Sequence, residues 1–302
     1  MQFDRIYKLT IGVQGKDGIV LEGKPYGDGL DISFDIIKDL TNKTNKCSLE
    51  IRNLSTASAK KIEREDSVCI LEVGYSEDIG LRRIFIGYIL TANTVASGAE
   101  RLTKLELADG QIPVRDSRVS LSYADAVSRK KCIDDCVKDM GLTVKYAEDC
   151  EFTTFANGFS FIGAARTCLD KICAGSNLQW SVQNNVVQVI KKGQTNNNKQ
   201  DAIKLSYQSG LVGFVERIVK GPKKADKKKA DKKKSKKAGS APREKKAGWK
   251  LKCLLQPTLS PADLIYIESA NVTGWFKIET LHHKGNYRGN EWYTEMEVYE
   301  IK

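Results

Sequence analysis

The pattern that most constrains this 302-residue chain is a period-two alternation of apolar and polar residues, which fills both ends of the sequence. Between residue 1 and about residue 112 it recurs in short runs separated by Gly, Asp and Asn, as in Leu30-Asp-Ile-Ser-Phe-Asp-Ile36 and Cys47-Ser-Leu-Glu-Ile51. Successive side chains of a strand point to opposite faces of a sheet, so each run predicts a strand with one buried face. Short strands at this spacing predict a closed or nearly closed barrel, with one helical segment at 55–62.

The middle of the chain, from about residue 118 to 193, follows a helical period instead. We expect one helix capped by Ser122 and ended by Gly141, and a second helix that follows Ser160 and ends at Gly175. Apolar residues spaced three and four apart give each helix one buried face. This region is predicted to be a small α+β module.

A hairpin is expected to close the module, because two apolar runs flank Asn184-Asn185 and Asn tolerates the left-handed backbone of a two-residue turn. Alternating strands resume at Ile203 and continue to the end of the chain. The predicted fold is therefore mainly β, with two similar β-barrel domains flanking a small α+β domain. The expected boundaries are 1–115, 116–195 and 196–302, with a Lys-rich loop at 220–247 inside the third domain.

The formal net charge of +11 lies entirely between residues 220 and 246, where 13 Lys and one Arg face three acidic residues. Such a segment can bind a polyanion by counterion release without sequence selectivity, and it contains no aromatic residue on which a base could stack. A solvated loop, contact with DNA or an acidic protein, and contact with anionic lipid all stay open. The candidate contact residues are Lys223, Lys224, Lys227, Lys228, Lys229, Lys232, Lys233, Lys234, Lys236 and Lys237.

No motif for catalysis, cofactor binding or metal binding is found in the sequence. Cys132 and Cys136 are one helical turn apart, but no Cys-x-x-Cys occurs and the only histidines, His282 and His283, are distant in sequence. We expect the eight cysteines to be reduced, structural thiols, because the first 15 residues lack the long apolar core of a signal peptide. Asp134-Asp135 is expected on a solvated helix face and the histidine pair beside a turn. The chain is predicted not to be an enzyme.

Several runs of residues, in the same order along nearly the whole chain, resemble the baseplate hub proteins of contractile-tailed bacteriophages. In the first β region these are Asn45-Lys-Cys-Ser-Leu-Glu-Ile-Arg-Asn-Leu-Ser55, Leu71-Glu-Val-Gly-Tyr75, Ile84-Phe-Ile-Gly-Tyr88 and Ala108-Asp-Gly110. In the last region they are Leu254-Leu-Gln-Pro257, Ser260-Pro-Ala-Asp263, Gly274-Trp-Phe-Lys-Ile278, His283-Lys-Gly285 and Trp292-Tyr-Thr294. The Lys-rich tract is not a feature of that family.

The resemblance implies a homotrimeric symmetry adaptor in which each subunit presents two barrels to the sixfold tail tube and the trimer receives a threefold central spike. Its partners would be further copies of itself, tube or tube-initiator proteins and the spike, with genomic DNA or the tape-measure protein in the lumen. Made in the host cytoplasm, it would reside in the virion baseplate, without stable membrane insertion. Two alternatives remain: a basic nucleic-acid-binding protein acting through the tract, and the equivalent hub of a contractile bacteriocin or secretion apparatus.

Overall fold

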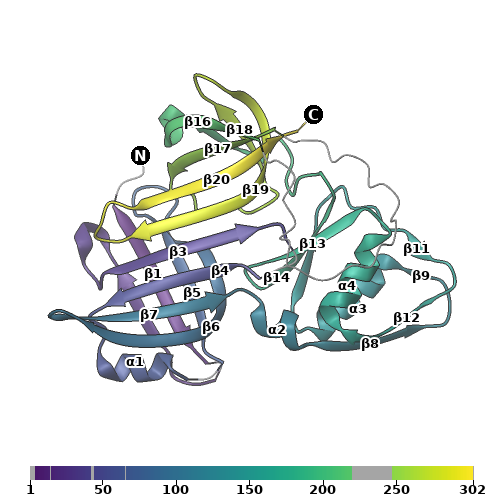
Figure 1. Cartoon of the computed structure of the whole chain (residues 1–302), viewed down its shortest axis with the longest axis horizontal. Helices are drawn as coiled ribbons and strands as arrows, with labels where there is room; N and C mark the ends of the chain where they lie inside the picture. The colour runs from purple at the N-terminus through teal and green to yellow at the C-terminus, as the bar shows by residue number, and fades with distance from the viewer. Residues whose placement is uncertain (1–3, 14, 42–43, 65, 220–246, 302) are drawn as a thin grey trace, which may run out of the picture.

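The computed structural model describes residues 4–13, 15–41, 44–64, 66–219 and 247–301. Most of these residues belong to a large antiparallel sheet, drawn on the left of Figure 1, and to a compact α+β module on the right. The fold is mainly β with a small α+β part, as the sequence predicts. No helix in the described part of the chain combines the length and apolar character needed to span a membrane.

The first β region contains seven strands and two short helical segments. They are β1 (Arg5–Gly12), β2 (Ile19–Gly23), η1 (Pro25–Gly27), β3 (Ile32–Asp39), β4 (Lys46–Arg52), α1 (Thr56–Ile62), β5 (Val68–Tyr75), β6 (Arg82–Ser97) and β7 (Glu100–Ala108). Helix α1 begins where the sequence predicts it, because the Ser55 side chain accepts a hydrogen bond from the backbone N–H of Ser58 and so caps the first turn.

The α+β module packs α3 and α4 together, with short strands around them. Its elements are α2 (Gln111–Asp116), β8 (Arg118–Tyr123), β9 (Val127–Ser128), α3 (Arg129–Asp139), β10 (Thr143–Tyr146), β11 (Thr154–Phe155), β12 (Phe159–Ala164), α4 (Ala165–Ala174), β13 (Leu178–Gln183) and β14 (Val186–Lys191). The predicted hairpin is confirmed: β13 pairs with β14, and Asn184 and Asn185 both have positive φ, 54° and 62°.

The predicted starts of the two helices in this module are wrong. Ser122 and Ser160 lie in β8 and β12 and face each other in an antiparallel ladder, because residues 118–123 alternate buried and exposed as a strand does. Helix α3 begins at Arg129 and is capped six residues later than predicted, by Ser128, whose side chain accepts a hydrogen bond from the N–H of Lys131. The predicted ends are confirmed: Gly141 follows α3 with φ of +70°, and Gly175 is the C-cap of α4.

The C-terminal β region completes the large sheet. Its elements are β15 (Ile203–Ser206), η2 (Tyr207–Ser209), β16 (Leu211–Val219), β17 (Ala247–Leu254), β18 (Leu264–Glu268), β19 (Thr273–Asn286) and β20 (Trp292–Glu300). The flanks of the predicted Lys-rich loop are thus the paired strands β16 and β17, as expected. The loop itself lies outside the described residues.

The sequence predicts two separate barrels, and these are not confirmed, because the described strands of both β regions belong to one hydrogen-bonded sheet of 13 strands. Its main path is β16-β17-β20-β19-β3-β4-β7-β6-β5-β1-β2, and β15 and β18 branch from β19. The junction is β19, whose 14 residues pair with β18 over 273–277 and with β3 over 280–286. A strand this long can serve both regions, so the ladder continues across their boundary.

Three main hydrophobic cores lie under this sheet and inside the module. The first is formed by the N-terminal strands together with Leu255, Tyr287 and Trp292 from the C-terminal region. The second fills the α+β module around α3 and α4, and the third lies within β15–β20. A small fourth cluster of Leu40, Ala147, Ile190 and Ala262 brings together residues from all three parts of the chain.

Candidate functional sites at a buried junction and an open sheet edge

The ten lysines predicted to contact a polyanion or partner, between Lys223 and Lys237, all fall in the segment 220–246. This segment lies outside the described residues, so the structure does not test their role. The remaining candidates, the cysteines, the aspartate pair and the histidine pair, are all described.

The cysteines are structural thiols, as predicted. All eight are free, and all but the half-buried Cys150 are buried. Cys132, Cys136, Cys168 and Cys173 share the core of the α+β module. Burial raises the pKa of Cys132 to about 11 and that of Cys173 to about 12, so both stay protonated and unreactive at neutral pH. Within the described residues, no group of three or more His, Cys, Asp or Glu is arranged to hold a metal ion.

Asp134 and Asp135 do not form a solvated face or a carboxylate pair. The hydroxyl of Tyr146 donates to Asp134 at 2.6 Å, and the hydroxyl of Tyr123 donates to Asp135 at 2.5 Å. Both carboxylates are half-buried, and the two tyrosines come from β10 and β8. The carboxylates therefore tie α3 to two flanking strands.

The two histidines lie inside β19, where it pairs with β3, and not beside a turn as expected. His282 Nε2 is 2.6 Å from Asp35 Oδ1 across this boundary. His283 is completely buried, and its Nδ1 is hydrogen-bonded to Thr294 Oγ1 at 2.9 Å. Burial lowers the pKa of His283 well below the usual value, so this ring is neutral at physiological pH.

A buried lysine lies beside these histidines. Strand β3 keeps its alternation to the end, so Lys38 falls on the inner face with Phe34 and Ile36, while Ile37 is 49% exposed on the outer face. The Lys38 side chain is 1% exposed and donates from Nζ to Asn184 Oδ1 at 3.1 Å. Burial lowers the pKa of Lys38 to about 8, against the opposing effect of Asp109.

Asp109, directly after β7, is the buried acidic partner of this site. Its carboxylate accepts the backbone N–H of Asn184 at 2.5 Å and that of Asn185 at 2.6 Å, so it binds both turn residues of the β13–β14 hairpin. Asn185 Oδ1 in return accepts the N–H of Gly110 at 2.9 Å. Burial raises the pKa of Asp109, and the hydrogen bond from Asn185 is the largest effect that opposes the rise.

Asn45 completes the junction between the module and the sheet. Its Nδ2 donates to Val182 O at 2.8 Å, to Gln183 Oε1 at 3.0 Å and to Asp109 Oδ2 at 3.2 Å. Gln183 Nε2 donates to Asp39 O at 2.9 Å. Figure 1 shows β13 and β14 on the side of the module that faces β3 and β4. The hairpin is therefore held by an enclosed polar network, and its members have partners from both units.

Sequence reasoning missed this junction. In the sequence, only a family resemblance or a predicted turn marks Asn45, Ala108-Asp-Gly110 and Asn184-Asn185. The available signal was the phase of β3, because continuing the alternation of Ile32, Phe34 and Ile36 by two residues places Lys38 inside the sheet. A cation at a core position requires an acceptor, which alternation cannot identify.

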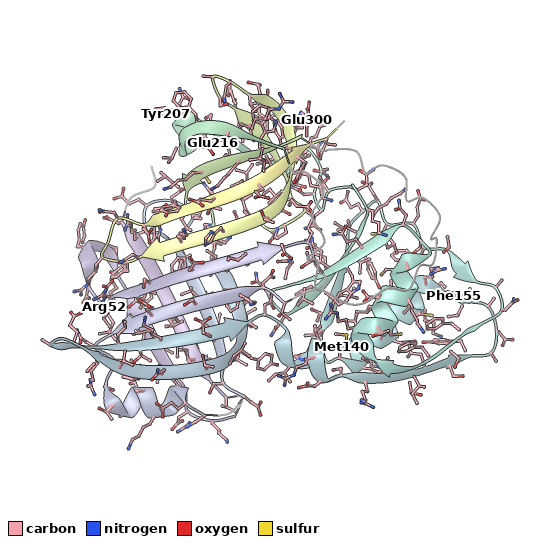
Figure 2. All side chains as sticks on the ribbon, viewed as in Figure 1. Arg52, Met140, Phe155, Tyr207, Glu216 and Glu300 are labelled. Atoms are coloured by element: carbon pink, nitrogen blue, oxygen red, sulfur yellow. The ribbon has the colours of Figure 1, made fainter. Side chains whose placement is uncertain are left out.

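The other notable feature is an exposed apolar patch at the β16 edge of the sheet. Tyr207 is 84% exposed and Phe214 is 80% exposed, and Val212 and Leu254 lie nearby. Figure 2 shows Tyr207 at the outer end of the C-terminal β region, pointing away from the ribbon. Phe214 stands in a bulge of β16 between Val212 and Glu216. We call Tyr207, Val212, Phe214 and Leu254 the β16 patch.

Comparison with known proteins gives matches in structure only. No family model matches the chain, and no curated protein matches it. The 43 kDa tail protein of prophage MuSo2 from Shewanella oneidensis has a TM-score of 0.64 at 8% identity, covering 98% of both chains. A tail protein from Neisseria meningitidis MC58 has a TM-score of 0.62 at 11% identity, covering 97% of this chain and 96% of that one.

A third similar structure comes from a secretion apparatus. The E. coli c3393 protein, a component of the type VI secretion system, has a TM-score of 0.58 at 8% identity over 97% of this chain and 77% of its own. That protein is described as structurally similar to the T4 bacteriophage tail proteins gp27 and gp5. The chain thus has the fold of phage tail proteins over nearly its full length, so the resemblance predicted from the sequence is confirmed at the level of the fold.

Proposed function

We propose that this protein is the baseplate hub of a contractile phage tail, a homotrimer that joins the sixfold tail tube to a threefold central spike. The observation that carries the proposal is the correspondence of fold with two tail proteins, one of them from a prophage, over 97% or more of this chain. The proposed role is structural, with no substrate turned over. Its proposed location is the tail baseplate of the virion.

The proposal keeps the division into units at 1–115, 116–195 and 196–302. Three hydrophobic cores, centred in the N-terminal, middle and C-terminal parts, support it, and the first of them also contains Leu255, Tyr287 and Trp292. Two quasi-equivalent β units in each of three chains would supply six surfaces to a sixfold ring. The boundary between the β units would then lie at the pairing of β3 with β19.

Self-association is supported by the edges of the sheet. Within the described residues, its main path ends at β2 on one side and at β16 on the other. An unpaired edge strand offers backbone N–H and C=O groups to another chain, and a heterologous contact between two different edges can close into a ring. The β16 patch lies at one of these edges, and Val20 of β2, 54% exposed, lies at the other.

Native mass spectrometry of the purified protein tests this proposal. A trimer has a mass of about 101 kDa, three times the 33.6 kDa of one chain. Phe214→Glu should abolish the trimer and leave a folded monomer, because a charge would be buried without a partner. Ile162→Glu, at an 83% exposed site in the module, is the matched control and should remain trimeric. Monomers of the unchanged protein, both alone and mixed with the tube and spike proteins, would refute the hub.

A second candidate is the equivalent hub of a secretion apparatus, which the similarity to the E. coli type VI component favours. The two candidates differ in where the protein assembles. Isolation of the tagged protein from induced cells separates them: a phage hub should be recovered in particles that contain DNA-filled capsids, and a secretion hub in envelope-attached complexes without capsids. The predicted lysine contacts with a polyanion or partner stay a proposal under either candidate.

A further inference from the structure

Two buried side chains of opposite charge contact the tip of one hairpin. Lys38 binds the side-chain oxygen of Asn184, and Asp109 binds the backbone N–H groups of Asn184 and Asn185. Lys38 lies in β3 of the large sheet and Asp109 directly follows β7 of the same sheet, and both are at most 1% exposed, whereas the hairpin belongs to the α+β module. Asn184 is thus held through its side chain by a cation and through its backbone by an anion.

Apolar side chains at the positions of Lys38 and Asp109 could also have packed the module against the sheet, without burying a charge. Lys38 occupies an inner-face position equivalent to those of Phe34 and Ile36, and a small apolar cluster of Leu40, Ala147, Ile190 and Ala262 already joins the three parts of the chain. Replacing buried charges of opposite sign by apolar residues of similar size is often neutral or stabilising. Stability alone therefore does not account for a lysine and an aspartate at these two positions.

The directional character of hydrogen bonds does account for a lysine and an aspartate at these positions. Apolar contacts allow a hairpin to slide or rotate, whereas hydrogen bonds to a carboxylate and an ammonium group require particular donor and acceptor directions. We infer that Lys38 and Asp109 form a clamp on the Asn184-Asn185 turn, which fixes the orientation of the α+β module relative to the large sheet. The clamp is a positioning device and does not depend on the proposed function.

Amide hydrogen exchange and spin-label distances test the clamp in Lys38→Met, Asp109→Asn and the double variant. An asparagine at 109 has one acceptor oxygen where the carboxylate has two, and it turns a donor toward the second amide. In all three variants the amides of Asn184 and Asn185 should exchange at least about tenfold faster, since a buried bond to a charged group is lost. Amides of Val187 and Val189, in the module core, should be unchanged.

Orientation is read from spin labels at Val20→Cys and Ile162→Cys in a Cys150→Ala background, with unlabelled protein in excess so that only pairs within one chain contribute. The unchanged clamp should give one narrow distance distribution, and each clamp variant should broaden it. Lys104→Met, which removes an exposed lysine paired with Glu50 at 2.9 Å in the same sheet, is the matched control and should leave the distribution narrow.

The double variant separates positioning from stability, and it covers the case in which a single variant fails to fold. Its urea midpoint should equal or exceed that of the unchanged protein, because no uncompensated charge stays buried. Its hairpin amides should nevertheless exchange faster and its distance distribution should be broad. If the double variant instead keeps slow exchange and a narrow distribution, apolar packing sets the orientation and the clamp is refuted.

Discussion

Replacing Gly285 by alanine should weaken the pairing of β3 with β19, on which the continuity of the large sheet depends. Gly285 lies directly opposite Phe34 in this ladder, and the Phe34 ring covers the glycine. A Cβ at position 285 would lie 2.2 Å, 2.3 Å and 2.9 Å from three ring carbons, well inside ordinary van der Waals contact. The ring or one strand would have to move.

Neither can move easily. Phe34 is 4% exposed and packs edge-on against Trp292, with ring centroids 5.4 Å apart at 69°, and Trp292 is 2% exposed. Gly285 is paired with Trp292 on one side and with Phe34 on the other, so both neighbouring strands hold its backbone. Overpacking in a closed core costs about 1–3 kcal/mol, and we expect the upper end, about 3 kcal/mol.

Urea denaturation followed by tryptophan fluorescence measures this cost. The double variant Gly285→Ala/Phe34→Leu serves as the control, because a smaller side chain at position 34 makes room for the new methyl group. Its loss of stability should be smaller than the sum of the two single losses by at least about 1 kcal/mol. A Gly285→Ala protein within about 0.5 kcal/mol of the unchanged one would show that the ring yields freely and that our account of the packing is wrong.

Three further predictions concern the junction and the Lys-rich tract. Because the folded-state pKa of Lys38 is about 8 and its ordinary value is 10.5, the unfolded chain binds more protons between these values, so the free energy of unfolding should rise with pH there. Compared with Lys38→Met, the unchanged protein should gain about 3 kcal/mol over this pH range, measured by urea titration at each pH. The groups that face the Lys38 ammonium are Asp109, Cys47, Asp263 and His283. An identical pH profile in Lys38→Met would contradict the burial of the lysine charge. Asn185→Ala should lower the free energy of unfolding by about 1–3 kcal/mol, because alanine tolerates the positive φ of 62° poorly and leaves the Gly110 N–H unpaired. Asn185→Gly removes the same bond but tolerates this backbone, so it should lose less, and a glycine variant as stable as the unchanged protein would show that the bond to Gly110 is unimportant. Deleting residues 223–246 and joining the flanks by a short turn should change the free energy of unfolding by only about 1 kcal/mol. The same deletion should remove salt-sensitive DNA binding in a filter or anisotropy assay. A deletion variant that binds DNA with the same salt dependence would show that the polyanion contact lies elsewhere.

Sequence alone determined the local structure of this protein, because that depends on near neighbours along the chain. Alternation identified the β-strands, its interruption at 55–62 identified α1, and Asn184-Asn185 identified a two-residue turn. Where local signals compete, the sequence-based prediction is wrong: Ser122 predicts a helix cap, although the alternation of 118–123 is that of a strand. The order of the tail-hub motifs also indicated the fold.

Only the tertiary structure decided which strands meet and which polar groups are enclosed. The sequence of β19 does not by itself reveal that its first half pairs with β18 and its second half with β3, because strand pairing depends on partner strands that lie far away in sequence. The same holds for Lys38, Asp109 and Asn184, which lie far apart along the chain and meet in one junction. Periodicity gives the face on which a side chain lies, but the partner that makes a buried charge tolerable is supplied by packing between units.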